Sequence, residues 1–296
     1  MKKQIRLILN IILVLVMAFA LVQFINSEID NRRSQEDYAL AKEIAAGQPT
    51  EEPSATVPQT EPPTEPPTEP LTEPQEETEV SEEALQETEA PTQSAPADPV
   101  IEELLAIDLD ALRHENEDVI GWIHIPGTRI SYPLLQWIDN DFYLEHTWTQ
   151  SSNASGAIFM EYQNKPDFSE FNTIIYGHNM RNGDMFGTLQ YYRSPEYWQK
   201  RPYVYIVNDD GVLRFDIFAV QSASTQSILY GLGLETDQRK EEFIRFAKDY
   251  SLIETEIFPT VDDRILTLST CTGQGHTYRW VVQSVLNEEA SYKRPQ

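Results

Sequence analysis

Cysteine is almost absent from this chain: among 296 residues there is only one, Cys271. A single thiol cannot close an internal disulfide, and the five scattered histidines add no zinc-type ligand spacing to it. The few glycines form no phosphate-binding loop. We therefore expect neither a metal nor a cofactor. Cys271 itself is either a buried packing residue, an intermolecular link or a reactive group.

Positive charge is also scarce, with 22 Lys and Arg against 48 Asp and Glu and a net charge of -26. Residues 51–100 contain no Lys or Arg at all, and they carry 13 Glu and one Asp. This balance argues against a nucleic-acid partner, because neutralising phosphates requires clustered cations.

The segment 48–99 is rich in Pro, Thr and Glu and poor in apolar residues. Such a composition cannot offset the entropy of ordering, so we expect a disordered tether. At about 3.1 Å per residue, fifty residues in polyproline II geometry would span up to roughly 150 Å. A recognition tract for a proline-binding partner is the alternative, and the composition favours a spacer.

Polar residues are nearly missing from 7–25, where only Asn10 and Gln23 interrupt the apolar run. Nineteen helical residues extend roughly 28 Å, close to the hydrocarbon thickness of a bilayer. Lys2, Lys3 and Arg6 precede the run and place the amino terminus in the cytoplasm. We expect residues 1–26 to be a cytoplasmic tip and single-pass anchor, 27–47 to be a weakly helical juxtamembrane stem, and the remainder to be extracellular. A cleaved signal peptide ending near 18–20 is the competing interpretation.

The globular part is expected to span 100–296. Apolar residues in 101–115 recur with helical spacing, and a second amphipathic helix is predicted over 237–250. A Pro-Gly turn at 126–127 separates two β-rich runs, 119–125 and 130–135. Eight short strands with few helices are typical of a closed or nearly closed β-barrel. The other six predicted strands are 157–160, 172–176, 203–208, 213–222, 264–270 and 278–286.

Cys271 follows an apolar, β-branched strand and precedes a glycine-containing loop, a position that favours a reactive group. If that loop folds back as a hairpin, Arg279 in the next strand comes close to Cys271 and supplies a fixed fork of donors. A reactive thiol also needs an acid–base partner. His178, directly after an apolar strand and a glycine, is the favoured histidine, and His276 in the loop after Cys271 is the alternative. His124 is expected to face outward from its strand.

Three separated segments resemble one family. Thr-Leu-Ser-Thr-Cys at 267–271 with Arg279 downstream, and Tyr-Gly-His-Asn-Met at 176–180, resemble the signature of the sortases, more narrowly class B. The intervening segments at 118–127, 132–135, 139–144, 156–160 and 185–189 agree with this, so the resemblance covers about 100–287. It implies a mostly β fold: an eight-stranded barrel with an N-terminal helix and a helix between the sixth and seventh strands.

The resemblance also implies an activity, that of a membrane-anchored cysteine transpeptidase. Such an enzyme cleaves a C-terminal sorting signal of a secreted protein after its threonine and passes the acyl group to an amine of the cell-wall peptide or of a pilin. By residue, it implies that Cys271 is the nucleophile, His178 the general acid and Arg279 the group that steadies the oxyanion. Ser269 and Thr270 would help to bind the signal's threonine. The spacing of eight between Cys271 and Arg279 is shorter than in some members, which predicts a compact loop over 272–278.

Two other functions fit the sequence less well. A papain-like cysteine peptidase places its cysteine at the start of a helix and ahead of its histidine in the chain, whereas here His178 comes first and both residues follow strands. A non-catalytic surface module on a stalk would tolerate loss of the cysteine, histidine or arginine, and all three are present.

Overall fold

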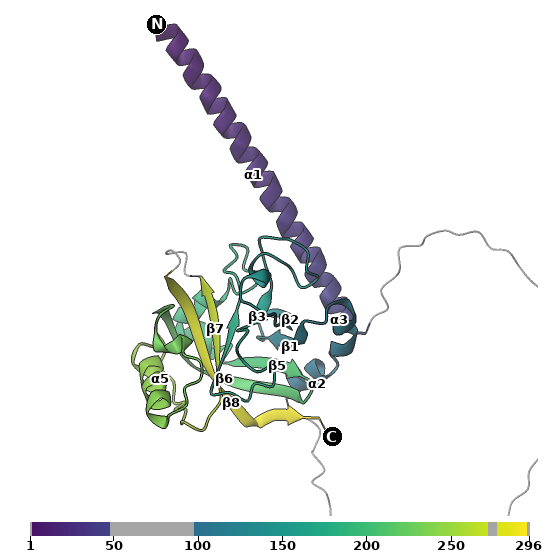
Figure 1. Cartoon of the computed structure of the whole chain (residues 1–296), viewed down its shortest axis with the longest axis vertical. Coiled ribbons are helices and arrows are strands. Elements are labelled where there is room, and N and C mark those ends of the chain that lie inside the picture. The colour runs from purple at the N-terminus through teal and green to yellow at the C-terminus, as the bar shows by residue number, and fades with distance from the viewer. Residues whose placement is uncertain (1, 48–97, 272–276, 295–296) are drawn as a thin grey trace, which may run out of the picture.

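The computed structural model describes residues 2–47, 98–271 and 277–294, without the side chains of 2–9 and 271. A long N-terminal helix leads into a compact β domain (Figure 1). The helices are α1 (Lys2–Ala45), α2 (Pro99–Leu105), α3 (Leu109–Glu115), α4 (Pro195–Gln199) and α5 (Asp237–Asp249). The strands are β1 (Val119–His124), β2 (Ser131–Leu135), β3 (Ile158–Met160), β4 (Asn172–Tyr176), β5 (Tyr203–Asn208), β6 (Gly211–Ser224), β7 (Ile265–Cys271) and β8 (Tyr278–Lys293).

The eight strands close into a barrel in the order β1-β2-β3-β4-β7-β8-β6-β5. Most neighbours are antiparallel, but β2 pairs with β3 and β4 pairs with β7 in parallel. The predicted eight-stranded barrel is therefore confirmed. Each strand begins within two residues of its expected start, but β8 continues to Lys293, seven residues beyond its expected end. The β-branched and aromatic side chains that predicted the strands fill the interior, where Ile123, Phe215 and Leu268 are almost fully buried.

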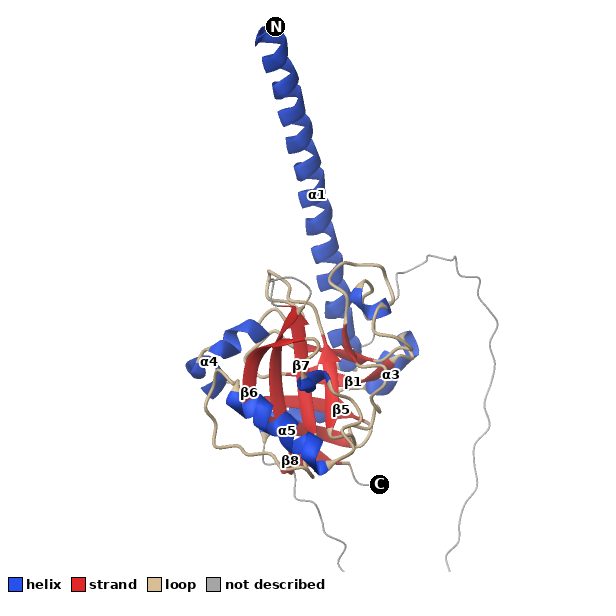
Figure 2. Ribbon diagram, turned by 60° about the vertical axis from the view of Figure 1, so that its left-hand side comes forward, coloured by secondary structure: helices blue, strands red, loops and turns tan. Residues whose placement is uncertain are grey.

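Helix α5 lies between β6 and β7 in the chain, as the resemblance implied. Thr236 caps its first turn by accepting a hydrogen bond from the amide of Arg239. Phe243 and Ala247 are fully buried, and they pack in a second apolar cluster with residues of β6, β7 and β8. Figure 2 shows α5 lying across the outside of the sheet, where it covers these strands.

The helix expected over 101–115 is two helices instead. Ala106 ends α2, and Asp108 begins α3 by accepting a hydrogen bond from the amide of Ala111. An aspartate one turn inside a helical pattern competes as an N-cap, and here that local bond interrupts the helix. Three short helical segments in loops, at 142–144, 189–193 and 228–230, were not predicted.

Residues 27–47 are not a separate stem. Helix α1 continues without a break to Ala45, and its part from Asp30 onward, a little over four turns, contacts the domain. Tyr38 is 5% exposed and Ala41 is 0% exposed, so both belong to the main core. The folded domain thus includes the C-terminal part of α1 as well as residues from 98 onward.

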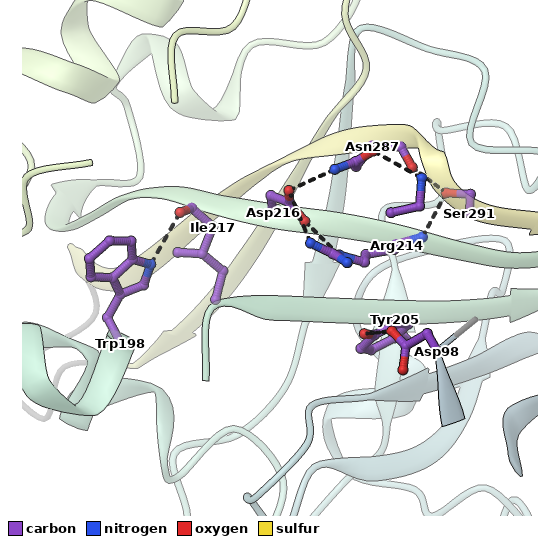
Figure 3. A network of polar contacts seen from close by, with 9 residues as sticks. Asp98, Trp198, Tyr205, Arg214, Asp216, Ile217, Asn287 and Ser291 are labelled. Carbon is purple, nitrogen blue, oxygen red and sulfur yellow. Dashed lines mark hydrogen bonds and ion pairs between the residues drawn. The ribbon is translucent and has the colours of Figure 1, made fainter. Parts of the chain in front are cut away.

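Polar contacts hold the end of the barrel near the C-terminus (Figure 3). Arg214 donates from Nε to Asp216 at 2.9 Å, and Asn287 of β8 donates to the same carboxylate at 2.9 Å. Tyr205 of β5 donates to Asp98 at 2.7 Å and so fixes the residue before α2. The tether predicted over 48–99 lies outside the described residues except for Asp98 and Pro99.

Candidate active site

Two parallel strands bring the cysteine and histidine segments to the same edge of the barrel. Tyr176 of β4 is paired with Ser269 of β7, and the amide of Gly177 donates to the Ser269 carbonyl at 3.3 Å. Parallel strands end on the same side of a sheet. His178 and Cys271 each follow this pair by two residues, so the backbone places them together although they are far apart in the sequence.

Arg279 is the direct cross-strand neighbour of Cys271. The antiparallel register of β7 and β8 pairs these two residues, so the predicted hairpin juxtaposition is present. Arg279 also pairs with Ala223 of β6 on its other side, and its guanidinium donates to the Tyr278 carbonyl at 3.2 Å. A residue between two strands has a fixed backbone position, which suits a group that must hold developing charge.

His178 is held by a backbone carbonyl. Its Nε2 lies 2.7 Å from the carbonyl oxygen of Leu144. A carbonyl only accepts, so Nε2 carries the proton and donates it. The loop that contains Leu144 turns back at Gly156, whose φ is +58°. The imidazole is therefore oriented from a loop that precedes β3, across the pocket from β7.

A pocket of about 330 Å³ opens at this end of the barrel. His178, Arg279, Ser269 and Thr270 all line it, so the structure brings together four of the five predicted site residues by side chain and Cys271 by backbone position. The remaining lining residues are Asn140, Leu144, Phe159, Tyr176, Gly177, Thr225 and Tyr230.

The hydroxyl groups of the two predicted substrate-binding residues differ in their hydrogen bonding. The Ser269 hydroxyl lies 2.7 Å from the Tyr230 hydroxyl. Thr270 is 2% exposed, and its hydroxyl has no hydrogen-bond partner within the described parts of the chain. A buried hydroxyl without a partner is costly, and a bound ligand would remove that cost.

A buried carboxylate that the sequence did not single out supports the pocket wall. Glu161 is 5% exposed and accepts from the Tyr176 hydroxyl at 2.9 Å and from Asn140 Nδ2 at 2.7 Å. Burial, together with the charge of Glu161, raises the pKa of Tyr176 far above its ordinary value. Tyr176 is thus a neutral donor at all working pH values. The available signal was an acidic residue directly after the apolar strand 158–160.

Among the described residues, no histidine other than His178 lines this pocket. His276 lies outside the described residues. His124 is half-buried, because it lines a separate cavity where α1 and α2 cover the barrel. Burial lowers its pKa. Among the described residues, no group of three or more His, Cys, Asp or Glu side chains is arranged to hold a metal ion.

Gly156 is a specific test of how His178 is positioned. A Cβ on Gly156 would lie 2.6 Å from the Tyr143 carbonyl, 2.8 Å from the Leu144 carbonyl and 3.0 Å from the imidazole of His178. We expect Gly156→Ala to displace the Leu144 carbonyl and to lower kcat for peptide cleavage by about 10-fold or more, since small displacements of catalytic groups are costly.

Gly233→Ala is the matched control. Gly233 has a φ of +60° and nothing within 4 Å of a built Cβ, so both variants acquire the same backbone strain of about 1–2 kcal/mol. Steady-state kinetics and thermal unfolding of the two variants separate the effects. Equal losses of kcat in both variants would show that backbone strain, and not the position of His178, causes the defect.

A sortase-domain family model matches residues 123–287. The chain belongs to the sortase family. Sortase B of Listeria monocytogenes is 34% identical over 164 residues, which are 55% of this chain and 67% of that protein.

The Staphylococcus aureus sortase B–substrate complex is 31% identical, with a TM-score of 0.58, and covers 60% of this chain and 84% of its own. Clostridium perfringens sortase B is 29% identical, with a TM-score of 0.58, and covers 61% of this chain and all of its own. The resemblance read from the motifs, to class B of this transpeptidase family, is therefore confirmed, and so is its barrel fold.

Proposed function

We propose that this protein is a membrane-anchored cysteine transpeptidase that cleaves the C-terminal sorting signal of secreted proteins after a threonine and transfers the acyl group to an amine. The observation that carries the proposal is the strand register. It places Cys271 beside Arg279 and brings the ends of β4 and β7, with His178, to the same edge of the barrel. Family membership supports the reaction class.

In the first half-reaction, the Cys271 thiolate, formed as its proton passes to His178, attacks the carbonyl carbon of the scissile bond after threonine. The carbonyl oxygen becomes an oxyanion, and the guanidinium of Arg279 stabilises it as a fixed donor. The C–N bond then breaks, His178 gives its proton to the leaving amine, and a thioester between threonine and Cys271 remains.

In the second half-reaction, an acceptor amine attacks the thioester. The C–S bond breaks, Cys271 leaves as the thiolate, and the proton lost by the amine returns to His178. The peptide amine of the cell wall or a pilin lysine is the acceptor that the family suggests. Water in place of the amine would give hydrolysis instead.

Because Nε2 of His178 donates to the Leu144 carbonyl, proton exchange falls to Nδ1. This assignment gives the Leu144 carbonyl a role in the reaction. It selects the tautomer, and it stabilises the imidazolium that must be present when the leaving amine is protonated.

The pocket is the proposed binding place for the signal. Its volume of about 330 Å³ is at the lower end of the range for ligand sites and suits a few residues of extended peptide. Thr270 offers a buried hydroxyl that lacks a partner among the described residues, and Ser269 with Tyr230 offers a second polar group. The solved Staphylococcus aureus sortase B–substrate complex supports the binding of a substrate by this fold.

The proposed membrane anchor is the apolar part of α1. In this helix, an apolar window of 18 residues starting near Asn10 has a mean hydropathy of 2.1. The folded domain buries none of it. Lys2, Lys3 and Arg6 precede it. We therefore propose one membrane span, with the amino terminus in the cytoplasm and the catalytic domain outside the cell.

The proposal is tested by product analysis. The full chain in detergent micelles is incubated with a peptide library that carries a central threonine and with several amines, and products are read by mass spectrometry. The full chain is used because the end of α1 belongs to the core. We expect acyl–amine products joined through threonine. Hydrolysis products alone, unchanged by any amine, would contradict transpeptidation and favour a cysteine peptidase.

A further inference from the structure

The C-terminal part of α1 is hydrogen-bonded to the loop 144–156 of the barrel domain. Tyr38 donates from its hydroxyl to the Gly156 carbonyl at 2.8 Å, and the Trp148 indole donates to the Asp37 carbonyl at 2.7 Å. The Ser34 and Ser155 hydroxyls lie 2.7 Å apart in a buried contact. These bonds, together with the buried side chains of Tyr38, Ala41 and Ile44, leave this part of the helix no freedom to swivel.

The docked part of α1 begins almost where the apolar part ends. Asn153 donates from Nδ2 to the carbonyl of Asp30 at 2.8 Å, and this is the bond to the barrel nearest the apolar run. Ile25 is the last residue of that run and is 47% exposed. Five residues of α-helix advance only about 7.5 Å. A bilayer around the apolar run would therefore lie within two helical turns of the 144–156 loop.

The pocket end of the barrel is on the side from which α1 projects. In Figures 1 and 2, which share a vertical axis, the C-terminal end of β7 points toward the side of the N-terminus of α1. The opposite end holds the last described residue, Arg294, whose amide donates to the Asp210 carbonyl at 2.7 Å. Strand β6 joins the two ends, from Gly211 at the far end to Ser224 beside the pocket.

Residues 48–97 leave and rejoin the same domain. Before this segment, the Ala45 carbonyl accepts a hydrogen bond from the amide of Asp108 at 2.9 Å. After it, Asp98 accepts from Tyr205 of β5 at 2.7 Å. A segment with both ends attached to one folded unit cannot set the distance between that unit and the membrane, so the tether predicted from composition does not act as a spacer to the bilayer.

From these contacts we propose that α1 holds the catalytic domain directly on the membrane surface, with the pocket end of the barrel toward the bilayer. The proposal rests on the membrane anchoring put forward above. Its partner is a lipid surface, and its consequence is that substrates are cleaved close to the membrane. The region 48–97 contributes nothing to this placement.

The test measures energy transfer from two ends of one strand to labelled lipid. In the Cys271→Ala background, an introduced cysteine is the only thiol and takes the donor dye. Gln226→Cys lies just beyond β6 near the pocket, and Asp210→Cys lies just before it. Both positions are exposed. Positions 210 and 226 are sixteen residues apart, so the probes are separated by at most about 54 Å, a useful range for energy transfer to lipid. Full-length protein is reconstituted into vesicles with an acceptor dye on the lipid headgroups.

We expect clearly more efficient transfer from position 226 than from position 210. A flexible insertion of about fifteen Gly and Ser residues between Ser27 and Glu28 is expected to abolish the difference, since such a linker lets the domain move freely. Replacing 48–97 with about ten such residues is expected to leave it unchanged.

Vesicle flotation, measured first, separates the two proposals. Protein that does not float with the vesicles would refute membrane anchoring and the placement with it. Protein that floats but gives equal or reversed transfer from the two positions would refute the placement alone. A difference that survives the flexible insertion would also overturn it, because α1 would then not be the element that orients the domain.

Discussion

Replacing Cys271 with alanine is expected to lower cleavage of a sorting-signal peptide by roughly 10⁴-fold or more, because the chain has no second thiol to form the acyl intermediate. Cys271→Ser keeps the shape and is expected to be nearly as inactive, since a hydroxyl there lacks the acidity of a thiol. Discontinuous cleavage assays by liquid chromatography quantify both variants.

Ser222→Ala, at an exposed position of β6, is the control for handling and folding. It is expected to keep full activity. Thermal unfolding should be unchanged in all three variants within about 1 kcal/mol of the wild-type free energy. Cleavage by Cys271→Ala at a rate close to that of the wild type would remove Cys271 from the nucleophile role.

Arg279→Lys is expected to reduce kcat by about 10²–10³-fold, the usual cost of losing one preorganised oxyanion donor. Lysine retains the positive charge but replaces a planar fork of donors with a single mobile point charge. The pairing of Arg279 with Cys271 and Ala223 fixes the backbone, so the loss arises from the head group alone. Steady-state kinetics divide the effect between kcat and KM.

Arg264→Lys provides the matched control. Arg264 precedes β7 at the opposite end and forms an ion pair with Glu288 at 2.6 Å. An ion pair of this kind, with Glu288 exposed to solvent, contributes about 1 kcal/mol or less, so its replacement should leave turnover intact. If Arg279→Lys were as active as Arg264→Lys, Arg279 would not stabilise the oxyanion.

Local patterns in the sequence were enough to predict the strands and α5, because the alternation of β-branched residues and amphipathic spacing are visible within a few residues. The hairpin that pairs Cys271 with Arg279 was also accessible, since the two strands are consecutive. The pairing of β4 with β7 could not be predicted, because parallel strands far apart in the chain leave no local signal. The histidine was selected only by its strand-end position and by the family motif.

The packing of the C-terminal part of α1 against the barrel was not predicted, and the reason is physical. Its buried face consists of Tyr38, Ala41, Ile44 and Ala45, but charged residues interrupt the pattern before it and the acidic segment follows it. A short amphipathic stretch between a membrane span and a low-complexity segment has no visible partner in the sequence. Glu161 was missed similarly, because its two shortest hydrogen bonds come from Tyr176 and from Asn140, which are distant in the sequence.

The central claim is that the reaction proceeds through a thioester on Cys271, and hydroxylamine tests it most directly. The full chain is incubated with a sorting-signal peptide in the presence of hydroxylamine, and products are identified by mass spectrometry. A thioester predicts a hydroxamate at the C-terminal threonine of the released fragment, formed in proportion to hydroxylamine and absent in Cys271→Ala. Cleavage that continues without any hydroxamate would contradict the account.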